Sequence, residues 1–345
     1  MPSARLHLTA IIPNRNHSAL LPRSLGALRR QSRQPDEIIV IDDASSDNSR
    51  DVVREFMASM PQLRLLENPV RLGVERSLNR GVQEATGDAV YCGAADDATD
   101  PEFFEVVLDA LERHPEAALA CSEARVLTEN GTPLGLRPIS MPAFRETYLS
   151  PADTANMLRR MDNCMLSVVA IWRRDRILAA GGFDPALGSF ADSFLQRRIA
   201  LESGFVFVPK VLGTWFVQPE SYSRSSSVNA DLMDRLIGAC CDRMKTAEGV
   251  VFPAGYSEVF VRRARFACAR IATMAPSYDP GLINALAHGG SAEKRFLTLA
   301  GWLPDALRRL AALGWLTLRL RPTSLVRLQQ SAAYRLRRKW QGLVA

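Results

Sequence analysis

The segment EIIVIDDASSD, residues 37–47, joins a run of apolar, mostly β-branched residues directly to a cluster of acidic and small polar residues. An uninterrupted apolar run of this length is typical of a parallel strand that is buried on both faces. The polar cluster marks the point where the strand ends and a helix begins. The pattern predicts a strand over residues 37–42, followed by a loop with carboxylates at its carboxyl end.

The same alternation of short strands and amphipathic helical patterns extends on both sides of this segment, from residue 6 to residue 121. Further strands are predicted at 6–12, 62–67, 88–94 and 117–121, and helices at 18–30, 47–57, 73–85 and 101–113. Four such units predict an α/β fold with a mostly parallel sheet flanked by helices. In sheets of this kind, ligands bind beyond the carboxyl ends of the strands.

The pattern changes after residue 123 and becomes helical in the last third of the chain. Strands are predicted at 165–172, 205–208 and 211–217, with a helix near 190–202. A serine-rich stretch at 221–227 is typical of a linker, and the sequence after it has helical periodicity. We therefore expect an α/β domain over residues 1–220 and a C-terminal α-helical extension over residues 221–345.

The positive charge of the chain is concentrated at its C-terminus. The formal net charge is +6, and the residues after position 300 include nine basic residues and one acidic residue. The rest of the chain is close to neutral, so nucleic-acid binding by the whole protein is not favoured. Three interpretations of the tail stay open: helices packed on the core with solvated arginines, an amphipathic helix on an anionic membrane surface, and, least favoured, nucleic-acid binding by RLRRKW at 335–340.

Neither a membrane-spanning segment nor a signal peptide is predicted. The longest apolar runs fall short of the roughly 18 residues that a transmembrane helix needs. The N-terminal segment turns polar at Asn14, too early for the apolar part of a signal peptide. We expect a cytoplasmic protein, peripheral at the inner face of the membrane if the tail binds lipid.

Two pairs of adjacent carboxylates follow predicted strands, Asp42-Asp43 and Asp96-Asp97. Helix capping accounts for neighbouring acids: Asp47 suits the start of one helix, and Asp100, directly before a proline, suits the next. Asp96 and Asp97 are then not needed as caps. Adjacent carboxylates repel each other unless a cation lies between them and an anionic ligand. The second pair therefore predicts a hard divalent ion shared with phosphates.

A third acidic candidate is Asp192, in the segment GSFADSFLQRR at 188–198. Ser189 and Asp192 have the spacing of a capping box, which is the structural explanation. A carboxylate at the start of a helix after a Gly-Gly turn can also serve as a general base that projects into a cleft. No GxGxxG or GxxxxGK[ST] pattern follows a predicted strand, so a nucleotide site here must use carboxylates and a metal ion.

Five segments of the sequence, in this order, resemble the motifs of family 2 glycosyltransferases: LTAIIPNRN, IIVIDDASSD, ENPVRLGVERSLNRGVQEATGD, AADD, and GGFD followed by FADSFLQRR. The resemblance covers roughly residues 6–217. It implies the GT-A fold of nucleotide-diphospho-sugar transferases and an inverting transfer of one sugar, with Mg²⁺ or Mn²⁺ as cofactor. The implied donor is a nucleotide sugar, a UDP-sugar being favoured, and the implied acceptor is a saccharide or a lipid-linked molecule. Bacterial surface polysaccharide or glycoconjugate biosynthesis is the implied role.

The resemblance also implies roles for individual residues. The implied donor-binding residues are Pro13, Asn14, Asp43, Asn68, Asn79 and Asp96. Of these, Asp43 would accept a hydrogen bond from the nucleotide base, and Asp96 would contact the ribose or the sugar. Asp97 would bind the metal ion, and Asp192 would be the catalytic base.

Two departures from the family pattern leave alternatives open. Ala191 stands where the family usually has a glutamate, and the QxxRW motif of processive synthases is absent at residues 196–199, so transfer of a single sugar is favoured. One alternative is a sugar nucleotidyltransferase, although its glycine-rich basic loop is replaced here by PNRNHS. The other is an inactive GT-A-like scaffold, which Ala191 alone favours.

Overall fold

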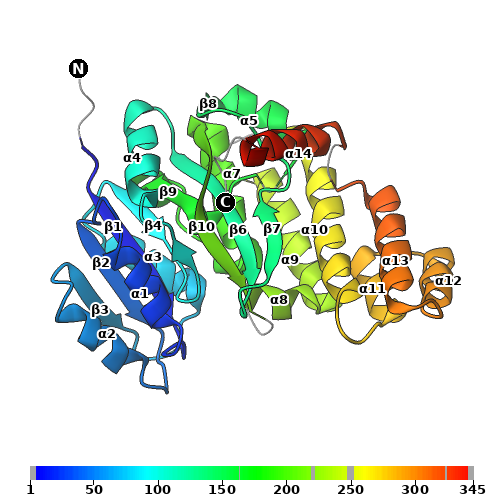
Figure 1. The fold of residues 1–345 in the computed structure, drawn as a ribbon, viewed down its shortest axis with the longest axis horizontal. Coiled ribbons are helices and arrows are strands. Elements are labelled where there is room, and N and C mark those ends of the chain that lie inside the picture. The colour runs from blue at the N-terminus through cyan, green and yellow to red at the C-terminus, as the bar shows by residue number, and fades with distance from the viewer. Residues whose placement is uncertain (1–4, 163, 219–221, 247–251, 323–324, 341–345) are drawn as a thin grey trace. The chain divides into compact units, whose positions relative to one another are not determined.

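The computed structural model describes residues 5–162, 164–218, 222–246, 252–322 and 325–340 (Figure 1). The chain divides into two compact units. Unit 1 comprises Met1–Ala155, Asn163–Val217 and Gln330–Ala345, and unit 2 comprises Asn156–Asp162 and Gln218–Gln329. The change near residue 220 that the sequence predicts lies close to Gln218, but the last residues of the chain belong to unit 1.

Unit 1 contains a sheet of ten strands among its described residues. The strands are β1 (Leu8–Asn14), β2 (Glu37–Asp42), β3 (Leu63–Glu67), β4 (Ala89–Cys92), β5 (Ala98–Thr99), β6 (Leu119–Thr128), β7 (Pro133–Arg137), β8 (Thr147–Leu149), β9 (Ala170–Arg173) and β10 (Phe205–Val217). Their main order is β3-β2-β1-β4-β9-β6-β10-β5, with β7 beside β6 and β8 beside β10.

The helices of unit 1 are α1 (Leu21–Arg29), α2 (Ser49–Met57), α3 (Val74–Glu84), α4 (Phe103–Arg113), α6 (Arg174–Ala179) and α7 (Ala191–Ser203), with the 3₁₀ helices η1 (Ser167–Val169) and η2 (Pro185–Phe190). Unit 2 contains α8 (Tyr222–Ser227), α9 (Ala230–Thr246), α10 (Tyr256–Thr273), α11 (Pro280–Ala287), α12 (Ser291–Ala300) and α13 (Asp305–Leu320). Residues of both units occur in α5 (Pro151–Leu158) and α14 (Leu325–Trp340).

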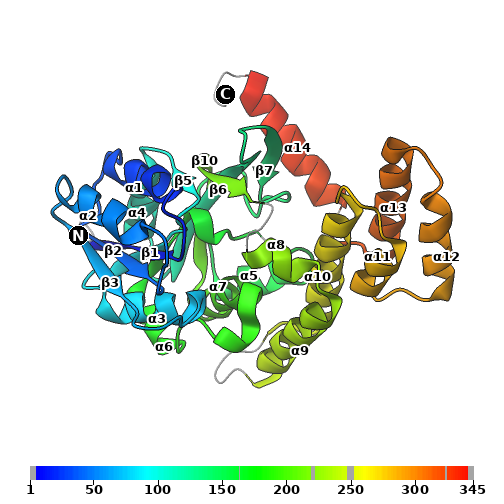
Figure 2. The same ribbon diagram turned by 90° about the horizontal axis from the view of Figure 1, so that it is seen from below.

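Helices cover both faces of the sheet in unit 1 (Figure 2). Leu8 and Ile12 of β1 point into a core cluster that includes residues of α1, α2 and α4. Ile11 points to the opposite face, where α3 packs so closely that a Cβ at Gly81 would lie 2.5 Å from the Ile11 side chain. The strands therefore need apolar residues on both faces, which explains why their sequences are continuous apolar runs.

The sheet contains antiparallel as well as parallel pairs of strands. Strands β3, β2, β1 and β4 are parallel neighbours, and β6 is parallel to β10. Strand β9, however, is antiparallel to both β4 and β6. The strand predicted at 165–172 is only partly correct, because residues 167–169 form η1 and β9 begins at Ala170. An apolar run does not reveal strand direction, because either direction buries the same side chains.

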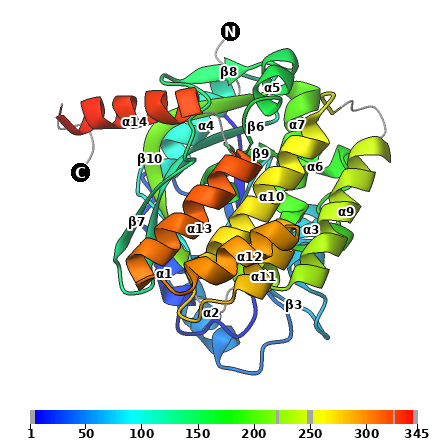
Figure 3. The same ribbon diagram turned by 90° about the vertical axis from the view of Figure 1, so that its right-hand side faces the viewer.

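Unit 2 consists of helices packed around α10 (Figure 3). Phe260 of α10, Ile283 of α11, Leu297 of α12 and Leu316 of α13 are fully buried or nearly so. The predicted serine-rich linker is wrong over residues 222–227, which form helix α8, while residue 221 lies outside the described residues. Serine has an intermediate helix propensity, so packing against a neighbouring helix can decide its conformation. No helix in the described part of the chain is both long and apolar enough to cross a membrane.

Two arginines of the basic tail bind a buried carboxylate in unit 1. Glu123 of β6 is fully buried. Arg335 of α14 donates to its Oε2 through Nε at 2.8 Å and Nη2 at 2.7 Å, and Arg338 Nη1 lies 3.3 Å from its Oε1. A buried carboxylate is tolerated when cations and hydrogen bonds satisfy it. These two arginines are therefore packed against the α/β core, whereas the packed-helix interpretation of the tail expected its arginines to be solvated.

Replacing Arg335 with alanine is expected to lower the free energy of unfolding by about 3–5 kcal/mol, because it leaves the Glu123 carboxylate buried with only the longer contact to Arg338. Urea unfolding followed by circular dichroism would measure the loss. Arg337 is the matched control, since it is exposed on the same helix, and Arg337→Ala should change the free energy by less than about 0.5 kcal/mol. Equal stability of the two variants would contradict this account of the tail.

Candidate active site

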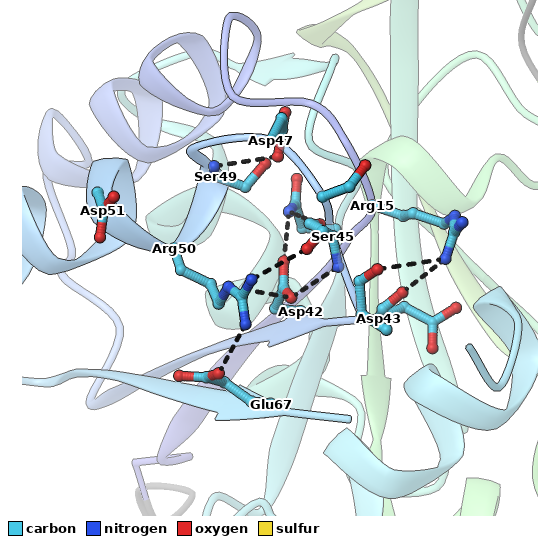
Figure 4. Close-up of polar contacts among 12 residues, drawn as sticks. Arg15, Asp42, Asp43, Ser45, Asp47, Ser49, Arg50, Asp51 and Glu67 are labelled. Carbon is cyan, nitrogen blue, oxygen red and sulfur yellow. Dashed lines mark hydrogen bonds and ion pairs between the residues drawn. The ribbon is translucent and has the colours of Figure 1, made fainter. Parts of the chain in front are cut away.

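The carboxyl ends of β1 and β2 meet in a network of polar side chains (Figure 4). The two strands are parallel with Asn14 opposite Asp42, which brings both side chains to the same edge. Asp42 Oδ1 accepts a hydrogen bond from Asn14 Nδ2 at 3.2 Å, and its Oδ2 accepts one from the Ser45 N–H at 3.0 Å. Arg50 donates to the Ser45 carbonyl at 3.1 Å and to Glu67 at 3.3 Å. The first acidic residue of the pair thus holds the loop after β2 in place.

Asp43 organises the next loop along the sheet. Its Oδ1 accepts hydrogen bonds from the Leu72 N–H at 2.7 Å and from Asn68 Nδ2 at 2.9 Å, and its Oδ2 accepts one from the Gly73 N–H at 2.9 Å. Burial acts to raise the pKa of Asp43, but these three hydrogen bonds and the charge of Arg15 outweigh it and hold the pKa below its ordinary value. Asp43 is therefore a firmly ionised carboxylate at the end of β2.

The structure brings together three of the predicted donor-binding residues. Besides its bond to Asp43, Asn68 donates to Ser77 Oγ at 3.0 Å and accepts from Arg80 Nη1 at 2.6 Å. Asn14 accepts the Asp43 N–H on its carbonyl oxygen at 2.8 Å, so Asn14, Asp43 and Asn68 form one connected group. The side-chain Oδ1 of Asn14 is buried and has no hydrogen-bond partner among the described residues.

Two other predicted donor-binding residues lie outside this connected group. Pro13 precedes Asn14 on β1 and is paired with Ile41 of β2. Asn79 of α3 binds the backbone of Phe183 through both groups of its amide: Nδ2 donates to the carbonyl at 2.8 Å, and Oδ1 accepts the N–H at 2.7 Å. The Asn79 side chain thus fixes the turn at Gly182 and Phe183 against α3.

Asp96 and Asp97 form a tight turn between β4 and β5. Asp97 is only 8% exposed, and its Oδ1 accepts the Phe216 N–H of β10 at 3.0 Å. Arg23 of α1 donates to the Asp96 carbonyl at 3.2 Å and stacks on the Phe216 ring, with its guanidinium carbon 4.0 Å from the ring centroid. Burial raises the pKa of Asp97 well above its ordinary value, and the charge of Asp96 adds to this effect. Ionisation of Asp97 in this turn is therefore unfavourable, despite the hydrogen bond from Phe216 and the charge of Arg23.

This turn fits a divalent metal ion of the hard class in its donor chemistry. Asp97 supplies carboxylate oxygen, the donor that Mg²⁺ and Mn²⁺ prefer, and a cation would offset the charge that raises its pKa. Within the described ranges, no group of three or more His, Cys, Asp or Glu side chains could hold a metal ion. The protein alone thus supplies few of the six ligands that these ions take, and water or a bound anion would provide the others.

Asp192 lies in the first turn of α7. Its Oδ2 accepts a hydrogen bond from the Ser167 hydroxyl of η1 at 2.6 Å, and its Oδ1 lies 2.6 Å from the Ser193 N–H. Burial raises the pKa of the Cys92 thiol to about 12, and the negative charge of Asp192 contributes. The Tyr91 hydroxyl of β4 also donates to a carbonyl of η1 at 3.3 Å, so η1 and the Asp192 carboxylate bound to it lie near the end of β4.

Two capping explanations offered by the sequence are wrong. The N-cap of α7 is Phe190, which makes no side-chain capping bond, so Ser189 and Asp192 do not form a capping box. Asp100 does not cap α4, whose N-cap is Glu102. Instead, the Asp100 carboxylate binds Arg125 of β6 through two hydrogen bonds of 2.7 and 3.0 Å. In both cases the carboxylate binds a partner distant in the sequence, Ser167 for Asp192 and Arg125 for Asp100, which capping patterns do not consider.

Two residues of the site have no signal in the sequence. Ser167 lies within an apolar run and has only its hydroxyl group to mark it, yet it binds Asp192. Arg23 lies in a helix with several other arginines nearby, and only the tertiary structure shows that it supports the turn at Asp96. Both contacts join segments more than 20 residues apart, so spacing cannot predict them.

The family model described as "Glycosyl transferase family 2" matches residues 9–172. Residues 9–172 are therefore a glycosyltransferase family 2 domain. The resemblance found in the sequence is thereby confirmed, and the protein is a glycosyltransferase. The match covers the ends of β1, β2 and β4, which carry Asn14, Asp43 and the turn at Asp96 and Asp97.

Individual proteins of similar sequence or structure are also glycosyltransferases. The chain is 25% identical over 199 residues to the amylovoran biosynthesis glycosyltransferase AmsE of Erwinia amylovora, a match that covers 58% of this chain and 71% of AmsE. It resembles the mannosyltransferase PcManGT of Pyrobaculum calidifontis, solved with GDP-Man and Mn²⁺, with a TM-score of 0.57, 21% identity and coverage of 97% of this chain and 88% of that one.

A second solved structure, residues 1–349 of S. aureus TarS in complex with UDP-GlcNAc, gives a TM-score of 0.59 at 14% identity, with coverage of 90% of this chain and 91% of that one. At these identities the likeness establishes the fold alone. The predicted GT-A-type α/β fold with a C-terminal helical region is confirmed.

Proposed function

We propose that this glycosyltransferase transfers one sugar from a nucleotide-diphosphate sugar to an acceptor hydroxyl, with inversion at the anomeric carbon and dependence on Mg²⁺ or Mn²⁺. The observation that carries the proposal is the pair of carboxylates beyond β4. Asp97 is buried next to the negative charge of Asp96, and Asp192 is held by the Ser167 hydroxyl near the end of the same strand. Each has a distinct environment, as expected for distinct chemical roles.

Asp192 is the group suited to remove the proton of the acceptor hydroxyl. An inverting transfer needs one base, because the acceptor oxygen attacks the anomeric carbon from the face opposite the leaving diphosphate. The oxygen becomes more acidic as its bond to carbon forms, so a carboxylate can take the proton late in the step. The hydrogen bond from Ser167 at 2.6 Å holds the Asp192 carboxylate in one orientation before the acceptor arrives.

The nucleoside diphosphate is the leaving group and gains negative charge as the bond to the sugar breaks. A divalent metal ion held by Asp97 would offset this charge when bound. Asp96 is positioned by the hydrogen bond from Arg23 to its carbonyl oxygen, and we assign its carboxylate to the ribose or the sugar. The PcManGT structure contains Mn²⁺ and GDP-Man, which supports the combination of metal ion and nucleotide sugar.

The nucleotide base is assigned to the group of Asn14, Asp43 and Asn68, with Pro13 beside it and Asn79 supporting the donor pocket from α3. Asp43 keeps its charge and can accept a hydrogen bond from a base N–H. Asn14 Oδ1 is a buried acceptor without a partner among the described residues, and a ligand donor would satisfy it. A UDP-sugar fits this assignment, because the uracil N3–H is such a donor.

The proposed role is the assembly of bacterial surface polysaccharide or another glycoconjugate, with a saccharide or a lipid-linked molecule as acceptor. AmsE, whose name refers to amylovoran biosynthesis, supports this role.

A thermal-shift measurement tests the donor assignment directly. UDP and UDP-sugars, in the presence of Mn²⁺, are expected to raise the melting temperature, because a ligand at a hundredfold excess over its Kd stabilises the folded state by about 2.7 kcal/mol. The shift should disappear with EDTA. GDP and ADP, measured in the same way, serve as controls for the base.

The outcomes separate the parts of the proposal. A shift with UDP that is unchanged by EDTA would contradict the metal dependence and leave the nucleotide site intact. If GDP gives the shift and UDP does not, the donor nucleotide contains guanine instead of uracil, and the proposed reaction is otherwise unchanged. No shift with any nucleotide or nucleotide sugar would contradict a nucleotide-sugar donor.

A further inference from the structure

A row of exposed apolar side chains lies on α12, on α13 and in the turn between them. We call this row the α12–α13 apolar face and define it by six residues with their exposed fractions: Leu299 (60%), Trp302 (84%), Leu303 (40%), Leu307 (54%), Leu310 (70%) and Leu318 (75%). All six belong to unit 2. Single exposed apolar residues are common on protein surfaces, but a contiguous row that includes an almost fully exposed tryptophan indicates an interaction surface.

The spacing of these residues gives the row a regular geometry. Leu307, Leu310 and Leu318 follow one another at intervals of three and eight residues, so they share one side of α13, and Leu303 lies in the turn before it. The side of α13 that packs on the rest of unit 2 carries Ala312, Leu316 and Leu320, which are buried. At 100° per residue the exposed and the buried rows point in nearly opposite directions. The buried row therefore stabilises unit 2, and the exposed row is not needed for packing within it.

Two basic residues without an acidic partner among the described residues flank the row in the sequence. On α12, Arg295 and Leu299 are four residues apart and so share one side, and Trp302 lies in the turn that follows the helix. Arg321 is the C-cap residue of α13, three residues after Leu318. Arg295 and Arg321 are exposed and form no ion pair with any other residue that the structure describes. By contrast, the arginines on the flanks of α13 are neutralised: Arg308 and Arg309 pair with Asp305, and Arg319 pairs with Glu293.

We infer that the α12–α13 apolar face binds an anionic lipid surface, with the leucines and Trp302 in the headgroup–acyl boundary and Arg295 and Arg321 at the lipid phosphates. Leucine, tryptophan and arginine in this arrangement are the composition of helices that lie in a membrane interface. Tryptophan in particular prefers the level of the headgroups. An apolar protein partner would not need two unpaired cations beside the row, whereas an anionic bilayer attracts both.

This inference assigns membrane binding to α12 and α13 rather than to the RLRRKW segment. Arg335 and Arg338 of that segment form ion pairs with Glu123. It does not depend on the proposed donor or on the catalytic base. If the acceptor is lipid-linked, which rests on the proposed function, the same surface would bring the enzyme to the membrane that contains the acceptor.

Co-sedimentation of the full-length protein with vesicles tests the inference. We expect binding to vesicles of phosphatidylcholine with phosphatidylglycerol, and weaker binding to vesicles of phosphatidylcholine alone. The double variant Leu310→Glu, Leu318→Glu should reduce the partition coefficient at least about tenfold, because it removes two of the most exposed leucines from the membrane contact. Arg295→Glu should reduce it by about fivefold or more on anionic vesicles and by much less on neutral ones.

Leu134→Glu is the matched control, because Leu134 of β7 is 52% exposed and lies outside the α12–α13 apolar face. It should bind vesicles as the wild type does. Every variant is checked by its melting temperature and by its thermal shift with nucleotide, so a loss of vesicle binding cannot be confused with misfolding or with failure of the donor site.

Two results would overturn the inference. One is wild-type protein that stays in the supernatant with anionic vesicles. The other is a dimer in analytical ultracentrifugation that Leu310→Glu, Leu318→Glu converts to a monomer without any change in vesicle binding, which would make a second copy of the chain the occupant of the face.

Discussion

Replacing Asp192 with asparagine is expected to lower the rate of sugar transfer by about 10²–10⁴-fold while leaving the domain folded, because this range is typical for the loss of a general base. An amide has nearly the shape of a carboxylate. It can keep the contact with Ser167, whose hydroxyl can accept a hydrogen bond as well as donate one, and it can still accept the Ser193 N–H. The amide cannot take up the proton of the acceptor, so the loss should appear in kcat.

Initial rates at saturating donor and acceptor measure this effect, together with the donor KM. The donor KM should change little, since Asp192 is assigned to the acceptor side of the reaction. Asp175→Asn is a suitable control, because its carboxylate is 73% exposed on α6 and should not affect the reaction. If Asp192→Asn retains more than a tenth of the wild-type kcat, the base is another group.

The positions of the site residues at strand ends could be predicted from the sequence for a physical reason. Strands β1, β2 and β4 are buried on both faces and are therefore continuous apolar runs, so the first carboxylates after them mark the carboxyl edge of the sheet. Asp43 and Asp97 were found in this way, and the family resemblance supplied the expected roles. Local pattern was sufficient here because each strand end is encoded by residues adjacent in the sequence.

The partners of these carboxylates could not be predicted, because they depend on contacts between distant segments. Asp100 binds Arg125 of β6, and Glu123 binds arginines more than 200 residues away. The antiparallel direction of β9 is a similar case, since β9 has the same apolar composition as a parallel strand. The capping explanation of Asp192 failed for the same reason: spacing suggested Ser189 as its partner, whereas the fold supplies Ser167.

Replacing Asp97 with asparagine is expected to have two opposite effects, a large loss of activity and a gain in stability of the free protein. The rate of transfer should fall by about 10²–10⁴-fold, because metal ions supply several kcal/mol of stabilisation to the charge that develops on a leaving phosphate. The thermal shift produced by UDP with Mn²⁺ should disappear or become small. Both results follow from loss of the carboxylate oxygen that is assigned to the metal ion.

The gain in stability follows from the surroundings of Asp97. Its pKa is raised in the folded protein, so at neutral pH its ionised form favours the unfolded state, and removing the charge removes this cost. The asparagine oxygen can still accept the Phe216 N–H, so β5 and β10 should stay paired. Each kcal/mol gained should raise the melting temperature of the free protein by about 2 °C in a chain of this length.

Asp100→Asn is the contrasting control for stability. Asp100 lies three residues from Asp97, but its carboxylate is paired with Arg125. Its substitution should therefore not raise the melting temperature. A rise with Asp97→Asn together with loss of transfer would identify Asp97 as a residue kept for function at the expense of stability. A fall in the melting temperature with Asp97→Asn, combined with unchanged transfer, would instead make Asp97 a structural residue that supports the end of β10 through Phe216.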